Sequence, residues 1–203
     1  MAGSDVKPVI VSDEVALDAD GISTAASVGN NAALTIGGAL ASGGSVTNAS
    51  GRQVTILSAG DDSGISFTVV GTDVNGSALS ETVTGANTGT ATSSGYFKTI
   101  TSITAVGNPA GNVSAGINNN ALGVIFAGRC RLKGFSTVSG GSAGKINIRN
   151  ASATGTELIQ ARTIGTDSSS EDPFIPEEGV LFPSGCYVTF VVGTVDLMMF
   201  YHA

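Results

Sequence analysis

The sequence predicts an all-β protein: an extended N-terminal arm followed by two small antiparallel modules that are β-sandwich or jelly-roll-like. Three observations favour this class. The chain of 203 residues has 29 glycines and no tryptophan. Its Val, Ile and Thr residues occur in short runs that end at Gly or Asp, which is typical of short strands joined by tight turns. No segment shows the apolar spacing of an amphipathic helix.

Residues 1–30 show no periodic pattern and are interpreted as an extended arm. Their acidic residues are Asp5, Asp13, Glu14, Asp18 and Asp20. Such an arm can grip a neighbouring subunit, and a disordered terminus is the alternative. The first residues lack a basic segment followed by an apolar run, so we expect no signal peptide. No apolar stretch has the length that a membrane span requires.

The first module is assigned to residues 31–118, and its clearest element is a β-hairpin over residues 65–85. In "ISFTVV" the larger apolar residues occupy every second position, which is the period of a half-buried strand. The strand "LSETVTG" returns after Asn75-Gly76, a pair that readily adopts positive φ at both centres of a type I′ turn. Two more strands are expected in "GYFKTITSITAVG" and "GNVSAGI", around the turn "GNPAG".

The second module is assigned to residues 119–203, with the Asn-rich "INNN" at residues 117–120 as the boundary. Alternating patterns predict strands in "RCRLKGFSTV" and "GKINIRN". The segment "TELIQARTI" is open to a helical interpretation, but the flanking Thr and Ile favour a strand. After the acidic loop "SSSEDPFIPEEG", two apolar strands are expected around Gly193.

The net charge of −7 and the pI near 4.4 disfavour nucleic acid as a partner, because phosphate binding needs clustered cations. The acidic excess lies in residues 1–120, which hints at two modules of different surface character. Arg129, Arg131 and Lys133 alternate with Cys130 and Leu132, so they share one face of a strand. This face could contact phosphate or an acidic protein, although a solvated strand face is the commoner explanation.

The sequence offers few groups for catalysis, and we expect no enzyme and no catalytic residues. The single histidine, His202, lies at the end of an apolar strand and is interpreted as a solvent-edge residue. The carboxylate pairs Asp61-Asp62 and Glu177-Glu178 lie beside glycines and are interpreted as solvated turn residues. Neighbouring residues on a strand point to opposite faces, so neither pair converges on a substrate.

No metal or cofactor site is predicted. The stretch "DADG", Asp18 to Gly21, resembles the start of an EF-hand loop, but Gly29 stands where that loop needs Glu. The glycine-rich "GGSAG" at residues 140–144 lacks the Lys of a phosphate loop and is interpreted as a hairpin turn. Cys130 and Cys186 are expected to be buried hydrophobic residues, and a single bridge stays open if their strands are neighbours. No closely spaced pair of ligands would unite them with His202 around a metal.

Two stretches of the first module, "FTVVGTDVNGSALSETVTG" and "GYFKTITSI", carry a resemblance to known proteins. Residues 51–117 as a whole are similar to a β-rich module of virion proteins from tailed phages, many of them with aquatic hosts. The C-terminal "RLKGFSTVSGGSAGKINIRN" and "IPEEGVLFPSGCYVTF" look like another small β-module of phage structural proteins. These turn-and-strand patterns imply a fold and a virion setting rather than a reaction, and they bring no catalytic residues.

The resemblance implies a head decoration or cement protein that binds the major capsid protein and stabilises the shell. A homotrimer on the capsid surface, assembled in the host cytoplasm, suits this role, because symmetry multiplies weak contacts. The alternative is a tail component, such as a tail-tip, fibre-base or receptor-adhesion protein. A carbohydrate-binding tip often exposes aromatic residues, and the candidates are Tyr96, Tyr187 and Tyr201, each more readily interpreted as structural.

Overall fold

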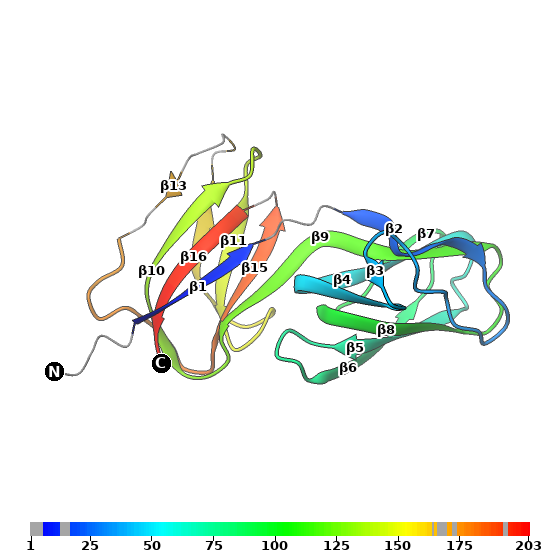
Figure 1. Cartoon of the computed structure of the whole chain (residues 1–203), viewed down its shortest axis with the longest axis horizontal. Coiled ribbons are helices and arrows are strands. Elements are labelled where there is room, and N and C mark those ends of the chain that lie inside the picture. Colours follow the sequence, from blue (N-terminus) through cyan, green and yellow to red (C-terminus); the bar gives the residue numbers. More distant parts are fainter. Residues whose placement is uncertain (1–5, 13–16, 164, 166–169, 172–173, 193–194) are drawn as a thin grey trace. The chain divides into compact units, whose positions relative to one another are not determined.

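The computed structural model describes residues 6–12, 17–163, 165, 170–171, 174–192 and 195–203, which contain β-strands and no helix (Figure 1). The predicted all-β class is therefore confirmed. The chain forms two compact units, which we name by their place in the sequence. The insert unit is Leu17–Asn118, and the terminal unit combines Met1–Ala16 with Asn119–Ala203.

The expectation of a separate N-terminal arm is wrong for the described residues. Strand β1 (Val6–Ser12) pairs with β16 (Val195–His202) over its whole length, and it buries Val11 in the core of the terminal unit. Strand β2 (Asp18–Ser27) pairs with β9 (Asn112–Phe126) in the insert unit. Both partner strands lie far away in the sequence, so no local pattern reveals the pairing.

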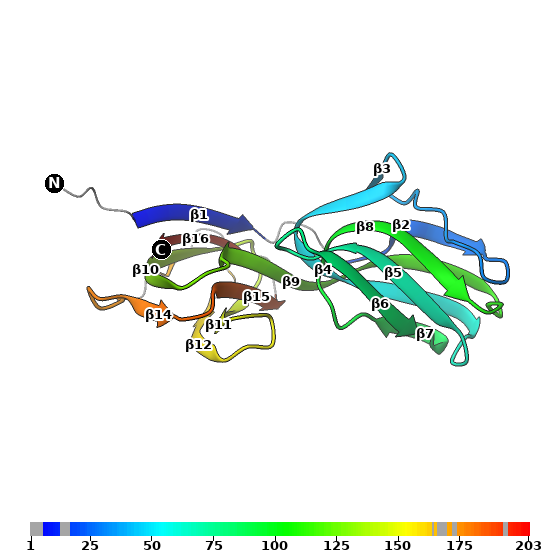
Figure 2. The same ribbon diagram turned by 90° about the horizontal axis from the view of Figure 1, so that it is seen from below.

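The terminal unit contains two antiparallel sheets, and most of their strands are labelled in Figure 2. The β16 sheet has the order β1-β16-β10-β13, and β14 also pairs with β10. The β15 sheet of this unit has the order β12-β11-β15-β9. The bounds of these strands are β10 Cys130–Ser139, β11 Lys145–Asn150, β12 Glu157–Arg162, β13 Ser170–Glu171, β14 Val180–Phe182 and β15 Cys186–Val192.

The two sheets enclose one apolar core, so the terminal unit is a β-sandwich. The β16 sheet contributes Leu132, Leu197 and Met199, and the β15 sheet contributes Ile148 and Val188, all of them fully buried. The segment that was open to a helical interpretation is strand β12, as expected from its Thr and Ile. The turn expected at Gly193 lies outside the described residues.

The insert unit is built around a long strand, β4 (Ser45–Asp61). It pairs with β3 (Ala41–Ser42), β7 (Asn87–Thr92) and β8 (Phe97–Val106). On its other side, β8 pairs with β5 (Ser66–Thr72), and β5 pairs in turn with β6 (Ala78–Thr84). Apolar residues at every second position of these strands form the core, in which Phe67, Phe97 and Ile103 are fully buried.

The predicted hairpin is confirmed, but its turn differs from the predicted type. β5 and β6 pair from Ser66-Thr84 to Thr72-Ala78, which leaves five residues in the turn. Gly76 has a φ of +82°, whereas Asn75 does not have a positive φ. The Asp73 carboxylate accepts hydrogen bonds from the main-chain N–H groups of Asn75 and Ser77, both at 2.9 Å. This capping stabilises a five-residue turn in which glycine alone adopts the left-handed conformation.

The Asn-rich segment expected to separate two modules lies inside strand β9. Contacts divide the chain between Asn118 and Asn119, so β9 contributes its first half to the insert unit and its second half to the terminal unit. Within the insert unit, the Asn118 side chain donates a hydrogen bond to Gln53 Oε1 at 2.9 Å. A polar residue is therefore accommodated in a strand by a side-chain partner, and the boundary needs no irregular linker.

Candidate docking face

The outer face of the β16 sheet is apolar across two neighbouring strands. Side chains directly opposite each other on paired strands share a face. Ile10 lies opposite Met198, and Pro8 lies opposite Phe200. Their chain neighbours Val11, Leu197 and Met199 are buried in the core, so these four residues point outward. Ile10 is 74% exposed and Met198 is 40% exposed.

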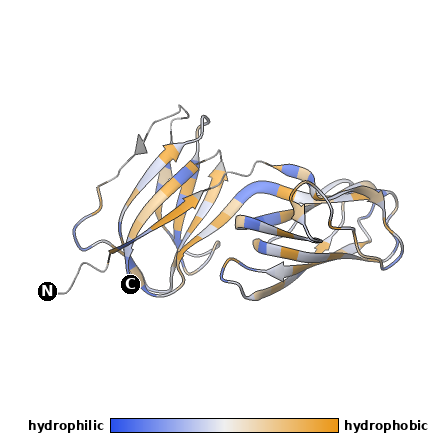
Figure 3. Ribbon diagram, in the orientation of Figure 1, coloured by the Kyte–Doolittle hydropathy of each residue, from blue (hydrophilic) through white to orange (hydrophobic). Residues whose placement is uncertain are grey.

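We call this surface the apolar stripe and define it as Val6, Pro8, Ile10, Met198 and Phe200. It borders β10, where Phe200 lies opposite Gly134. Figure 3 shows the hydrophobic residues along β1 and β16. Isolated exposed apolar residues are common on protein surfaces, but a contiguous group of them marks an interaction surface. Sequence analysis missed the stripe because β1 was interpreted as an arm without a partner strand.

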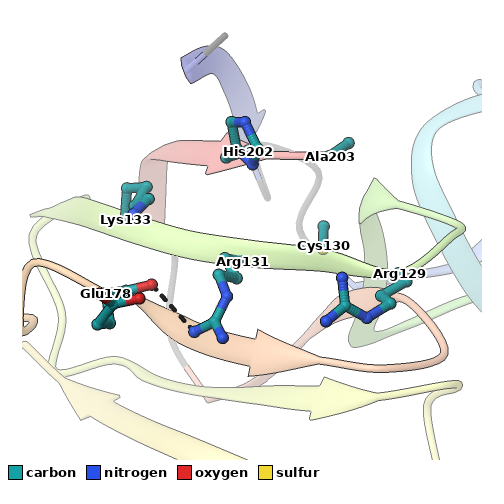
Figure 4. Close-up of a pocket in the computed structure, with 7 residues that line it drawn as sticks. All are labelled: Arg129, Cys130, Arg131, Lys133, Glu178, His202 and Ala203. Atoms are coloured by element: carbon teal, nitrogen blue, oxygen red, sulfur yellow. Dashed lines mark hydrogen bonds between the residues drawn. The ribbon is translucent and has the colours of Figure 1, made fainter. Parts of the chain in front are cut away.

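A cationic pocket of about 310 Å³ lies at the end of β10 that is nearest to His202. Figure 4 shows the residues that line it: Arg129, Cys130, Arg131, Lys133, Glu178, His202 and Ala203. The three cations predicted to share one face are thus brought together in one pocket. His202 lies directly opposite Arg131 and is exposed, as expected for a residue at a strand end.

Main-chain oxygens of the segment before β14 hold two of the cations in place. Arg131 Nη1 donates to the carbonyl oxygens of Glu178 at 3.1 Å and Gly179 at 3.2 Å. Lys133 Nζ donates to the carbonyl oxygen of Glu177 at 2.8 Å. Because these bonds go to carbonyl groups, they satisfy donors without neutralising the charges. Glu177 and Glu178 themselves are exposed, in agreement with the expected turn.

Arg129 differs from the other two cations of β10. It lies in the bend just before the strand, it is exposed, and it has no hydrogen-bond or ion-pair partner among the described residues. A guanidinium group offers five N–H donors in a planar fork that matches a carboxylate. The pocket can therefore accept an anionic group through Arg129, with Arg131 and Lys133 adding positive potential.

The two residues of the Asp61-Asp62 pair have different roles, and the expectation that both are solvated is wrong. Asp61 is exposed, and hydrogen bonds from Ser63 hold the pKa of its carboxyl below the usual value. Asp62 is fully buried, and its Oδ1 accepts the main-chain N–H of Ala110 at 2.7 Å. Its Oδ2 is buried without a hydrogen-bond partner among the described residues. Asp62 thus fastens the turn between β8 and β9 to the end of β4.

The remaining candidates do not form a site in the described part of the chain. Asp18 accepts a hydrogen bond from the N–H of Asp20 within β2, so "DADG" is strand rather than calcium loop. The stretch "GGSAG" joins β10 to β11, but these strands belong to different sheets and do not pair, so the expected hairpin turn is wrong and the stretch is a link between the two sheets. Cys130 and Cys186 are buried and unbridged. No three His, Cys, Asp or Glu side chains among the described residues are grouped to hold a metal ion.

No known family, curated protein or solved structure matches this chain. Among the described residues, no helix is long and apolar enough to cross a membrane.

Proposed function

We propose that this chain is a virion structural protein of a tailed phage, acting as a head decoration or cement protein on the major capsid protein lattice. The observation that supports this most is the apolar stripe beside the cationic pocket, on one sheet of the terminal unit. Stable docking needs an apolar centre and a polar rim, and it needs no reactive groups. The role is therefore mechanical rather than enzymatic.

The order of strands in the terminal unit also supports a virion role. Taken along the chain, the first strand pairs with the last (β1 with β16), the second with the seventh (β9 with β15), and the fourth with the fifth (β11 with β12). The third strand, β10, pairs with β13 and β14, which together stand sixth. A long hairpin rolled into two sheets gives this order, and we infer a jelly roll, an architecture found in viral capsid domains.

The two features of the face indicate the chemistry of the partner surface. The apolar stripe requires an apolar patch on the partner, and the cationic pocket requires an acidic side chain or a short acidic segment of the partner. The chain as a whole is acidic, with a net charge of −7, so a local cationic pocket orients the partner rather than attracting any anionic surface. We infer that a carboxylate of the major capsid protein enters the pocket and pairs with Arg129.

We further propose that the chain forms a homotrimer at a symmetry axis of the shell. Several copies linked by symmetry bind with a high effective concentration, so each face can be small. We propose assembly in the host cytoplasm and final residence on the capsid surface, with no contact to nucleic acid or membrane.

A tail component is the second candidate, because jelly rolls also occur in lectin domains. A carbohydrate site would present exposed aromatic rings. Tyr187 is buried, and Tyr201 stacks on Phe126 with ring centroids 5.4 Å apart. Phe174 is 88% exposed, but it is a single aromatic residue in a loop rather than part of a group of exposed rings. This arrangement favours the head over the tail.

Copy number in purified virions tests the proposal. Quantitative mass spectrometry of the phage whose genome encodes the chain should find it in hundreds of copies, because a shell offers many equivalent sites. A handful of copies per particle would assign it to the tail, and its absence from infectious particles would refute a virion role altogether.

A further inference from the structure

Two segments of the terminal unit share the spacing Phe-x-x-x-Cys: Phe126 to Cys130 and Phe182 to Cys186. In each segment the phenylalanine ends one strand and the cysteine begins the next. The first segment leads from β9 in the β15 sheet to β10 in the β16 sheet. The second leads back from β14 in the β16 sheet to β15. Each link crosses between the sheets in only three residues.

The two crossing links lie side by side, since each phenylalanine is opposite the cysteine of the other segment. Cys130 pairs with Phe182, and Cys186 pairs with Phe126. Directly opposed residues of antiparallel strands have Cα atoms about 4.5–5.5 Å apart. At Gly185 a Cβ atom would come within 3.1 Å of the Phe126 carbonyl oxygen. The topology therefore brings the two cysteines together at one end of the sandwich.

The two thiols lie near enough to shift each other's pKa. Both belong to the same buried core cluster. The hydrogen bond from Cys186 lowers the pKa of the Cys130 thiol, although burial opposes this effect. The same hydrogen bond raises the pKa of Cys186, and burial adds to the increase. Cys130 also lines the cationic pocket.

We infer that Cys130 and Cys186 are a redox pair that closes a disulfide between the two sheets when a low-molecular-weight disulfide is present. The inference does not depend on the proposed function. The Cys130 thiolate attacks one sulfur of the oxidant, whose S–S bond breaks and releases one thiolate. Cys186 then loses its proton to solvent and attacks the Cys130 sulfur of the mixed disulfide, which releases the second thiolate. The protein loses two electrons and two protons, and the oxidant becomes two thiols.

The bond would join the sheets directly, as the inter-sheet disulfide does in antibody domains. It would enclose a loop of roughly 57 residues, so it restricts the unfolded chain strongly. Because the pocket beside Cys130 is lined by Arg129 and Arg131, an anionic oxidant should react faster than a cationic one at low ionic strength.

The test uses the full chain, first reduced and then incubated with oxidised glutathione. We expect the intact mass to fall by two hydrogen atoms, a non-reduced digest to contain the Cys130–Cys186 peptide pair, and Tm to rise by on the order of 10 °C. Two free thiols after prolonged incubation, a bond between two chains, or an unchanged Tm in the bridged protein would each overturn the inference.

The variant Cys186→Ala provides a matched control, because it keeps Cys130 and its pocket. Its Tm should not rise with oxidised glutathione, and a rise equal to that of the wild type would overturn the assignment of the pair. Cystamine, a cationic disulfide, should bridge the wild type roughly tenfold more slowly than oxidised glutathione at low salt. Equal bridging rates with the two oxidants would show that the cationic pocket does not influence the reaction. If the variant does not fold, the mass and Tm of the wild type decide the question.

Discussion

The terminal and insert units both expose large apolar side chains, but they surround them differently. In the insert unit, Val106 is 53% exposed and lies opposite Ser66. Val70 lies between Ser80 and Ser102. In the terminal unit, the exposed Ile10 and Met198 lie directly opposite each other on paired strands. The comparison indicates that contiguity, rather than exposure alone, distinguishes a docking face from an ordinary strand surface.

Charged groups also have different roles in the two units. Carboxylates of the insert unit accept hydrogen bonds from main-chain N–H groups in turns, as Asp62, Asp73 and Glu81 do. In the terminal unit, Arg131 and Lys133 are held by main-chain carbonyl groups around an open pocket. Carboxylates therefore stabilise turns in the insert unit, whereas two cations of the terminal unit are held at the wall of a pocket without a carboxylate partner.

The largest expected effect is on docking, from the substitution Ile10→Glu. Placing a charge in the centre of the apolar stripe should weaken binding to purified phage heads by on the order of a hundredfold, as for an interface hot spot. Co-sedimentation with heads measures the affinity. The matched control is Val106→Glu, a similarly exposed strand residue of the insert unit, which should bind like the wild type. Equal losses in both variants would contradict the distinction between the two units.

The second effect concerns stability, from the substitution Asp62→Ala. Removing this buried carboxylate breaks its hydrogen bond with the main-chain N–H of Ala110, which ties the turn between β8 and β9 to β4, and should lower the free energy of unfolding by about 2 kcal/mol. Urea unfolding measures the change. The neighbouring Asp61→Ala should change it little, because Asp61 is exposed. If Asp61→Ala proves the more damaging variant, the structural role of Asp62 is wrong.

The third effect is electrostatic, from the substitution Arg129→Glu. Reversing this charge should weaken docking to heads roughly tenfold at low salt, and the loss should shrink as the salt concentration rises. Arg162→Glu makes the same charge change on the exposed edge strand β12 and should bind normally. A loss that salt leaves unchanged would argue against a carboxylate partner in the pocket.

The smallest effect distinguishes the two descriptions of the β5–β6 turn. Gly76→Ala should lower the stability by about 1 kcal/mol, because alanine is strained at a φ of +82°. Asn75→Ala should cost much less, since Asn75 is not in the left-handed region. Thermal unfolding of both variants provides the measurement. Comparable losses of stability in the two variants would support the type I′ turn instead, because that turn requires positive φ at both residues.

Local sequence patterns were sufficient to predict where strands occur, but they were insufficient to predict which strands pair. The alternation in residues 65–85 identified the hairpin, because both strands and their turn are adjacent in the sequence. The pairing of Val6–Ser12 with Val195–His202 could not be predicted, because nothing local specifies a partner at the other end of the chain. The chain termini thus belong to one unit, with the other inserted between β1 and β9.

The candidate site was predictable in part for the same reason. The alternation of Arg129, Arg131 and Lys133 in the sequence predicted a shared face, and the structure places all three around one pocket, although Arg129 lies in the bend before β10 and a register shift falls beside Lys133. The apolar stripe depends on two strands that meet only in the folded chain. The burial of Asp62 depends on the main-chain N–H of Ala110, which is likewise remote in the sequence. Features that depend on residues close together in the sequence could be predicted from it, whereas features that depend on contacts between distant strands could not.

An electron cryomicroscopy map of the intact virion tests the central claim most directly. The account predicts regular density for this chain over the outer shell, with β1, β16 and β10 facing the capsid protein and an acidic group of that protein beside Arg129. Density confined to the tail, or a shell-bound chain that turns the apolar stripe toward solvent, would contradict it.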